Sequence, residues 1–464
     1  MFVNYTDRLA DFMATLHVDD IPPDIRRLAR VNMMDGIGVI VAGQAFLEHE
    51  SDFRLKNYIS LQSGAGQSTA LGFNQSLSMQ NAGFVNGSLS EVLDWQDTTM
   101  PARLHSGSGT VPAVLAAGEW RKSSGPDILK AMVVGYEVGA RVGVAMQPSH
   151  WYEGFQATGT IGAIGAAAAV GSLMGFNTSQ MSSVLGVAGF IAAISNGDGV
   201  FHGFSIKPVH GGMAAQAGIQ AALLVASGFE AGPLEGLEPR KHGFMNIASE
   251  IYDPESISNG LGTDWKSRDC SQKLYPVGLL IIGPVQVTLE LVNKYAINPE
   301  QVEKILVTSY SDTLHFVGTH YTSVDSTYID AHLSLPYAVA VAISDKEYGW
   351  RQQSQQRIND PVVHELASKV KVDVDKTMDQ TYPMDWPVRV EITLKDGSVF
   401  SQRLDKVTGC PSRPMTDDEL VFKFMGNTTG LIGEENSKRV QEMLMEIENV
   451  DTVNEILELL IPMN

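Results

Sequence analysis

Cysteine is scarce in this sequence. Only Cys270 and Cys410 occur in 464 residues, and their separation matches no metal-binding or C-x-x-C spacing. Two distant cysteines build no disulfide framework, and both are expected to be free thiols in a reducing compartment. The first twenty residues also lack the basic stretch and long apolar run of a secretory signal. We therefore expect a cytoplasmic protein.

Positive charge is also in short supply. Lys and Arg number 33 against 53 Asp and Glu, which gives a formal net charge of -20. No basic stripe offsets this balance, so a nucleic-acid partner is excluded, because the polyanion would be repelled. A small anionic substrate is still compatible with the composition, provided that a few Lys, Arg or His side chains converge locally.

Charged residues are absent altogether between positions 154 and 197. A membrane hairpin is one interpretation of such a stretch. However, Gly, Ala, Ser, Thr and Asn dominate it, the segment GFNTSQMSS interrupts it, and no Lys or Arg cluster flanks it. Small residues let helices approach closely, so we expect buried core helices here and no membrane partner.

Apolar spacing divides the chain into a helical part and a mixed part. Residues 1–265 show one helical pattern after another, each ending near a Gly or a polar turn. Alternating β-branched patterns appear at 303–310 and at 387–405, where two runs flank a Lys-Asp-Gly turn. The sequence therefore predicts a mainly α protein, with a large all-helical domain over 1–265 and a smaller α+β domain over 266–405. The helices of 406–464 are expected to return to the first domain.

Several common catalytic motifs are missing. The sequence contains no P-loop, no G-x-S-x-G elbow, no H-E-x-x-H helix and no Cys/His cluster. The glycines of GFQATGTIG do not form a dinucleotide fingerprint, because no strand precedes them and G-x-G is absent. We expect neither a metal nor a cofactor.

One polar stretch, LDWQDTTMPARLHSGSGTVPA at 93–113, concentrates chemically useful side chains: Asp94, Asp97, Thr98, Arg103 and His105. It has two interpretations. In the first, a Ser or Thr after His105 caps a helix, and the polar residues are simply solvated. In the second, the stretch is one wall of an active site, and His105 serves as an acid, a base or a carboxylate donor. Asp94 and Asp97 are spaced i, i+3, so both can face one side of a helix.

Three further loops carry polar side chains where a helix begins. Lys207 and His210 precede a long helix whose Gly pair leaves amide groups free for an anion. Lys273 and Tyr275 lie in a loop beside a proline, and Gln156 opens a buried helix. Each loop by itself can be an ordinary solvated surface. Together they would form an anion pocket that works by proton transfer without a metal or cofactor.

Blocks of sequence in a fixed order resemble the MmgE/PrpD family. They include FVNGSLSEVLDWQDT, HSGSGTVPAVLAAGE, GFQATGTIGAIGAAAA, KPVHGGMAAQAG, KLYP and AHLSLPYAVAVAI, and they cover nearly the whole chain. This family includes 2-methylcitrate dehydratase, cis-aconitate decarboxylase and iminodisuccinate epimerase. The resemblance implies that the α+β domain is a lid on a helical domain formed by the N-terminal part and the tail. It also implies a homodimer, for which the Gly/Ala-rich helix faces would offer an apolar interface.

The resemblance also implies site residues. The positions that match the family's pocket are Asp94, Thr98, His105, Lys207, Lys273 and the lid residue Tyr337. The chain departs from the family at Gln156, where a histidine is usual, and at Gly278 and Ile282, where Cys or His and a further His are usual. Glutamine cannot exchange protons near neutral pH. The groups left for proton transfer are His105, the lysines, Tyr337 and the aspartates.

These observations lead to a functional hypothesis. We expect a cofactor-independent lyase that acts on a small di- or tricarboxylate or a related acid by dehydratase-like β-elimination. Decarboxylation and isomerisation or epimerisation are the alternatives on the same scaffold, since each needs a base and a proton donor in one pocket. A homologue that binds a carboxylate without catalysis is the alternative from another class. The apolar segment 277–284 indicates fewer polar groups on the substrate than a tricarboxylate carries.

Overall fold

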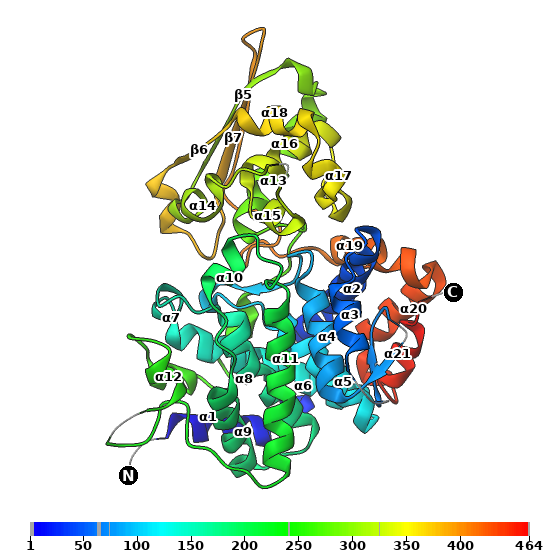
Figure 1. Cartoon of the computed structure of the whole chain (residues 1–464). Helices are drawn as coiled ribbons and strands as arrows, with labels where there is room; N and C mark the ends of the chain where they lie inside the picture. The colour runs from blue at the N-terminus through cyan, green and yellow to red at the C-terminus, as the bar shows by residue number, and fades with distance from the viewer. Residues whose placement is uncertain (1–3, 63–65, 74, 240–241, 324, 463–464) are drawn as a thin grey trace.

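The computed structural model describes residues 4–62, 66–73, 75–239, 242–323 and 325–462. A helical body carries a smaller part with a β-sheet on top of it, as Figure 1 shows. The chain is mainly helical, and its C-terminal region contains a small mixed four-stranded sheet, which confirms the predicted fold class.

The body is built from long helices with short connections. Its main helices are α1 (Tyr5–Thr15), α2 (Pro23–His49), α4 (Met79–Glu91), α5 (Ser106–Arg121), α6 (Gly125–Met146), α8 (Ala157–Leu173), α9 (Thr178–Ile191) and α11 (Val209–Ala226). The shorter helices are α3 (Arg54–Ser60), α7 (Ser149–Tyr152), α10 (Gly197–Phe201) and α12 (Phe244–Ile247). Strands β1 (Ser68–Ala70) and β2 (Gln75–Leu77) form a small antiparallel ladder beside them.

Helix α8 lies at the centre of the body, in contact with α5, α6, α9 and α11. Its glycines and alanines are buried, because their small side chains let four neighbouring helices approach closely. The uncharged stretch therefore forms core helices, as predicted. The faces of α8 are therefore covered by other helices of the same chain.

Within the described residues, only helix α11 is long and apolar enough to cross a membrane by length and composition. It packs against α4, α5 and α8, and 61% of its apolar window is buried inside the fold. This is the position of a core helix.

The upper part contains a sheet with strand order β6-β5-β7-β8. Strand β5 (Val302–Ser309) runs parallel to β6 (Val370–Val374) and antiparallel to β7 (Val388–Leu394), which pairs with β8 (Val399–Leu404). The predicted hairpin is present, and Gly397 has the positive φ of 89° that its turn requires. The helices of this part are α13 (Leu279–Tyr295), α14 (Ser311–Thr313), α15 (Tyr328–His332), α16 (Leu335–Asp345), α17 (Gln355–Ile358) and α18 (Pro361–Ser368).

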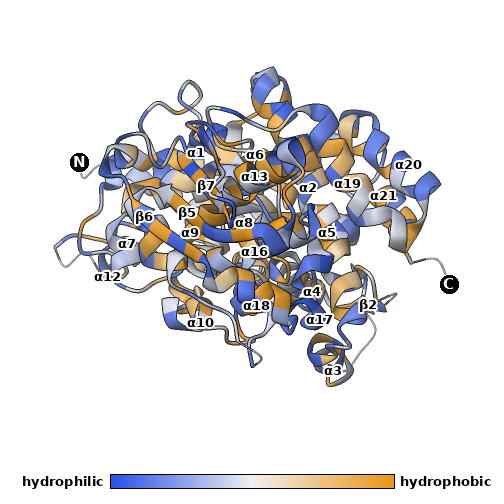
Figure 2. Cartoon of the chain, turned by 90° about the horizontal axis from the view of Figure 1, so that it is seen from above, coloured by the Kyte–Doolittle hydropathy of each residue, from blue (hydrophilic) through white to orange (hydrophobic). Residues whose placement is uncertain are grey.

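A pair of strands joins the body to the upper part, and the end of the chain returns from the upper part to the body. Strand β3 (Thr98–Thr99) of the body pairs with β4 (Cys270–Ser271), which directly precedes the upper part. At the other end, α19 (Asp417–Ile432) and α20 (Glu434–Met445) pack on α2, and α21 (Asn454–Leu459) contacts α5. In the view from above (Figure 2), hydrophobic segments lie in the interior of the molecule, whereas α20 at its outer edge is largely hydrophilic. The last helices thus complete the body.

Candidate active site

A cavity of about 780 Å³, counting its mouth, lies between the body and the upper part. Four helices begin at its wall: α5 after His105, α8 after Gln156, α11 after Lys207-Pro208, and α13 after Gly278. None of the four has a side-chain N-cap hydrogen bond. Helix N-termini favour negative charge, so four of them make the cavity a receptive site for an anion. The polar loops expected from the sequence do converge.

His105 is held in one tautomer. Its Nδ1 lies 2.8 Å from the main-chain oxygen of Asp97 and 2.9 Å from Oγ1 of Thr98. A carbonyl oxygen only accepts, so Nδ1 carries the proton and Nε2 is left with a free lone pair. Burial, together with the nearby Lys273 ammonium, lowers the pKa of His105 to about 4. His105 is therefore a neutral base at pH 7.

The start of α5 differs from the prediction of a Ser or Thr cap. His105 occupies the N-cap position without a side-chain cap bond, and Asp97 Oδ1 accepts a hydrogen bond of 2.9 Å from the Gly107 N–H instead. Asp97 also accepts from Tyr136, below the pocket. Asp94 turns the other way, because it lies beyond the end of α4 with a positive φ of 50°. The expectation that both carboxylates face one side of a helix was therefore wrong.

Asp94 binds both pocket lysines. Its carboxylate accepts from Lys273, lies 3.2 Å from the Lys207 Nζ, and its main-chain oxygen accepts a 2.8 Å bond from Lys273. Burial alone would raise the pKa of Asp94, but the ammonium groups of Lys207 and Lys273 hold it well below its usual range. Burial lowers the pKa of Lys273, against the opposing effect of Asp94. Lys273 is thus a buried ammonium that is readier than usual to give up a proton.

Glu91 forms a second ionic layer behind the wall. Its Oε2 lies 2.7 Å from His210 Nε2 and 3.9 Å from Lys207 Nζ and accepts a hydrogen bond from Gln96, whereas its Oε1 accepts from Ser108. Burial alone would raise the pKa of Glu91, but the contacts with His210 and the Lys207 ammonium lower it to about 2. The other ring nitrogen of His210, Nδ1, is buried and has no hydrogen-bond partner among the residues described. An unpartnered polar atom in a cavity wall is a natural contact for a ligand.

A close crossing of α4 and α11 brings Glu91 and His210 together. A Cβ added at Gly87 of α4 would lie 2.7 Å from the main-chain oxygen of Gly211 in α11. Only glycine permits this approach, which brings Glu91 at the end of α4 next to His210 at the start of α11.

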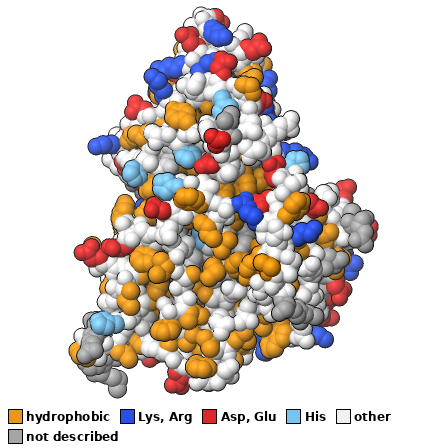
Figure 3. Space-filling model, in the orientation of Figure 1, with side chains coloured by type: hydrophobic (Ala, Val, Ile, Leu, Met, Phe, Trp, Pro, Cys, Tyr) orange, Lys and Arg blue, Asp and Glu red, His pale blue; other side chains and the backbone are white. Residues whose placement is uncertain are grey.

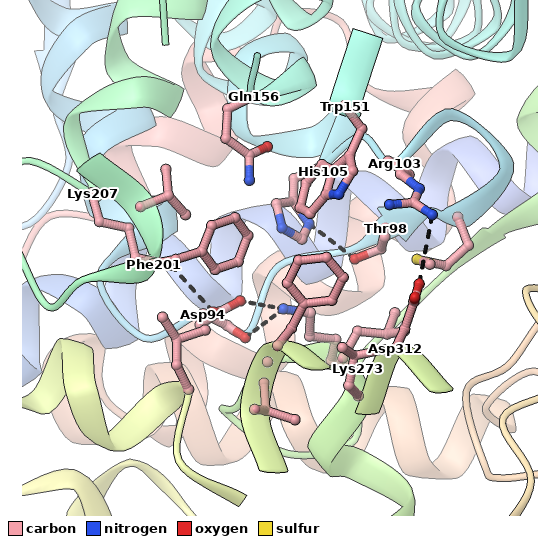
Figure 4. Close-up of a pocket in the computed structure, with 18 of the residues that line it drawn as sticks. Asp94, Thr98, Arg103, His105, Trp151, Gln156, Phe201, Lys207, Lys273 and Asp312 are labelled. Atoms are coloured by element: carbon pink, nitrogen blue, oxygen red, sulfur yellow. Dashed lines mark hydrogen bonds and ion pairs between the residues drawn. The ribbon is translucent and has the colours of Figure 1, made fainter. Parts of the chain in front are cut away.

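Arg103 reaches the upper part. Its guanidinium lies 3.6 Å from Asp312 Oδ2 and stacks over the rings of Trp151 and Tyr152, with centroids 5.0 and 5.6 Å away. Figure 4 shows this pair on one side of the cavity, Lys207 and Gln156 on the other, and His105 between them. Arg103 is thus positioned to bridge the two parts.

The departures from the family pattern have different outcomes. Gln156 and Gly278 line the cavity, so no proton-exchanging group stands at either place. Ile282 stands where the family usually has a histidine, but it is fully buried in the core of the upper part and does not line the cavity.

Two expected residues lie away from the cavity. The Tyr337 hydroxyl is buried and donates a 2.5 Å hydrogen bond to the Gln352 main-chain oxygen within the upper part. Tyr275 packs against Tyr348 with ring centroids 6.3 Å apart. Tyr337 is fully buried within α16, and Tyr275 packs against the hydrophobic core. The other expected residues, namely Asp94, Thr98, Arg103, His105, Gln156, Lys207, His210 and Lys273, line one cavity.

Sequence reasoning missed the contribution of the upper part. Helix α14 and the π-helical turn Leu314–Gly318 after it contribute Asp312, Phe316 and Val317 to the cavity wall, and connecting segments contribute Leu333 and Tyr382. None of these segments carries a periodic or motif signal in the sequence. The body adds Met100, Trp151, Val200 and Phe201, of which only the two aromatic residues in short polar segments could have drawn attention. Across the described ranges, no group of three or more His, Cys, Asp or Glu side chains could hold a metal ion.

Comparison with known proteins gives the same assignment in both parts of the chain. The MmgE/PrpD N-terminal domain matches residues 7–256, and the MmgE/PrpD C-terminal domain matches residues 275–449. The chain is 26% identical to cis-aconitate decarboxylase of Aspergillus terreus, over 98% of this chain and 95% of the relative. It is 24% identical to cis-aconitate decarboxylase of Mus musculus, over 99% and 94%, and 25% identical to the cis-aconitate decarboxylase-like protein oryM of Aspergillus oryzae, over 98% and 97%. The chain therefore belongs to the MmgE/PrpD family.

Proposed function

We propose that this protein is a lyase that removes a group from a small carboxylate by proton transfer between its own side chains, without a bound cofactor. The observation that carries the proposal is His105, a neutral imidazole whose Nδ1 is fixed by the Asp97 carbonyl and whose Nε2 is left free, in a cavity that Lys207 and Lys273 also line. A base and a proton donor in one anion-receptive cavity are the requirements of elimination chemistry.

In the proposed β-elimination, Nε2 of His105 accepts the proton from the carbon next to the substrate carboxylate. The electron pair of that C–H bond forms the carbon–carbon double bond, and the bond from the adjacent carbon to its hydroxyl group breaks. The hydroxyl takes a proton from the Lys273 ammonium and leaves as water. Lys207 pairs with the substrate carboxylate, where negative charge grows as the proton is removed.

Decarboxylation is the second candidate, because the similar proteins from Aspergillus terreus and Mus musculus are named cis-aconitate decarboxylases. In that reaction the bond to a carboxylate carbon breaks, carbon dioxide leaves, and the remaining electron pair takes a proton from one of the pocket acids. Isomerisation would use the same groups to return the proton at another position.

The two reactions can be separated in one experiment. The protein, treated with a chelator, is incubated in heavy water with hydroxylated and unsaturated mono-, di- and tricarboxylates and followed by proton NMR and carbon dioxide release. β-Elimination predicts loss or gain of water with deuterium entering next to the carboxylate, and no carbon dioxide. Ligands that bind without conversion or exchange would show a binding protein and overturn the proposal.

We also propose that the protein is a homodimer whose interface includes the end of α9, a helix of the Gly/Ala-rich stretch. An apolar groove on the body is lined by Phe190, Ile194, Leu237 and Ile247, of which Phe190 is 88% and Ile247 is 71% exposed. Figure 3 shows hydrophobic side chains gathered over one face of the body. Exposed apolar patches of this kind are typical of subunit interfaces.

A further inference from the structure

The fixed charges around the cavity nearly cancel. Lys207 and Lys273 face Asp94, Lys207 also faces Glu91, and Arg103 faces Asp312. Three lysine and arginine side chains therefore meet three carboxylates, and Glu91 also has His210 Nε2 at 2.7 Å from its Oε2. A ligand with several carboxylates would find too few unpaired cations, and each carboxylate beyond the first would lose its water without gaining a partner. The net charge of -20 on the whole chain adds to this penalty.

Much of the remaining cavity lining is apolar. It includes residues of α10, α13 and the upper part: Phe201, Leu279, Leu280, Phe316, Val317 and Leu333. Trp151, Phe201 and Phe316 form one aromatic cluster, with centroids 5.3, 5.6 and 5.8 Å apart. This cluster joins the body to the upper part beside Arg103. An apolar wall of this extent binds hydrocarbon and repels charge.

One anion site is available around Lys207. Lys207, Gln156 and His210 line this part of the cavity, where the Lys207 side chain reaches toward Asp94 (Figure 4). Gln156 and Gly278 leave two wall positions without an ionisable group. One carboxylate fits the Lys207 ammonium and the Gln156 amide, and among the described residues that line the cavity there is no second pair of a lysine and an amide.

We propose that the substrate is a monocarboxylate with an apolar aryl or branched-alkyl substituent, and that polycarboxylates are disfavoured. This inference rests on the proposed function for its reacting end, since the carboxylate at Lys207 places the adjacent carbon beside His105. The apolar substituent then lies against the cluster of Trp151, Phe201 and Phe316. Two effects would therefore select this substrate class. The apolar substituent gains contact with the aromatic cluster, and a polycarboxylate would leave some of its carboxylates without a cationic partner.

The test compares ligands that differ in carboxylate number and substituent. The probes are 3-hydroxy-3-phenylpropanoate, 3-hydroxybutanoate and citrate, measured by calorimetry and by exchange in heavy water. We expect the phenyl compound to bind at least tenfold more tightly than hydroxybutanoate and a hundredfold more tightly than citrate. Its β-elimination would give cinnamate and water, by loss of the proton next to the carboxylate and of the hydroxyl group on the next carbon.

A variant reverses the preference. Phe316→Arg places a cation in the apolar wall and should raise citrate affinity at least tenfold while lowering affinity for the phenyl compound. Leu280→Lys tests the same wall from α13, in case Phe316→Arg does not fold. Phe400→Arg is the matched control, because Phe400 packs on Tyr295 and does not line the cavity, so the ligand order should not change.

The outcomes separate this inference from the proposed function. Binding in the expected order without exchange or conversion of any ligand would support the substrate class and overturn the lyase. Tighter binding or faster conversion of citrate than of the phenyl compound would overturn the substrate class and leave the lyase standing. An unchanged ligand order in both folded wall variants would also overturn the substrate class.

Discussion

Replacing His105 by Ala distinguishes a catalytic base from a loop histidine. The side chain is half-buried and borders the cavity, so its removal leaves space that water can enter. The lost interaction is chiefly one hydrogen bond to the Asp97 carbonyl, which contributes about 1 kcal/mol to stability. A lost general base costs about a hundredfold to ten-thousandfold in rate, or roughly 2.7 to 5.4 kcal/mol of activation free energy. We expect the second effect without a matching loss of fold.

The chain offers a matched control at His150. Burial lowers the pKa of this histidine to about 4 as well, but both ring nitrogens are occupied, by the Ala248 main-chain oxygen at 2.6 Å and by Thr160 Oγ1 at 2.8 Å. His150 does not line the cavity. His150→Asn should therefore lower the free energy of unfolding more than His105→Ala does, and leave kcat/KM of the folded protein nearly unchanged.

The assay pairs steady-state kinetics on a converted ligand with urea unfolding of each variant. Added imidazole should restore part of the His105→Ala rate, because it can enter the emptied space and accept the proton. If His105→Ala retains the original kcat/KM, or if His150→Asn is equally inactive while folded, the assignment of the base is wrong.

Three further predictions use the same assays. On its acidic side, kcat/KM should fall near pH 4 rather than near 6.5, because burial and Lys273 keep His105 neutral down to that pH and only the neutral ring accepts a proton. Circular dichroism at each pH checks that the protein stays folded. A fall in kcat/KM near pH 6.5 would contradict the lowered pKa of His105. Lys207→Ala should raise KM at least tenfold and change kcat less, since its charge acts on bound substrate and transition state alike; an unchanged KM would refute a carboxylate at this end. Phe190→Glu with Ile247→Glu should convert a dimer into a folded monomer in light scattering, and an unaltered mass would place the interface elsewhere.

Local sequence determined the elements of this protein. Helical periodicity, glycine stops and the Lys-Asp-Gly turn predicted the helices, the hairpin and the mixed C-terminal region, because these features depend on residues near one another in the chain. The helix-opening loops with Asp94, His105, Lys207 and Lys273 were recognisable for the same reason, since polar residues at helix starts are a local signal.

Only the tertiary structure decided how those side chains work. The tautomer of His105 depends on the Asp97 carbonyl, and the low pKa of Asp94 depends on lysines far away in the sequence. Tyr337 is removed from the site by packing inside the upper part, whereas Asp312 and Phe316 enter it from segments without a pattern. Burial, charge pairing and the apolar wall arise where distant segments meet, and no local pattern encodes that meeting.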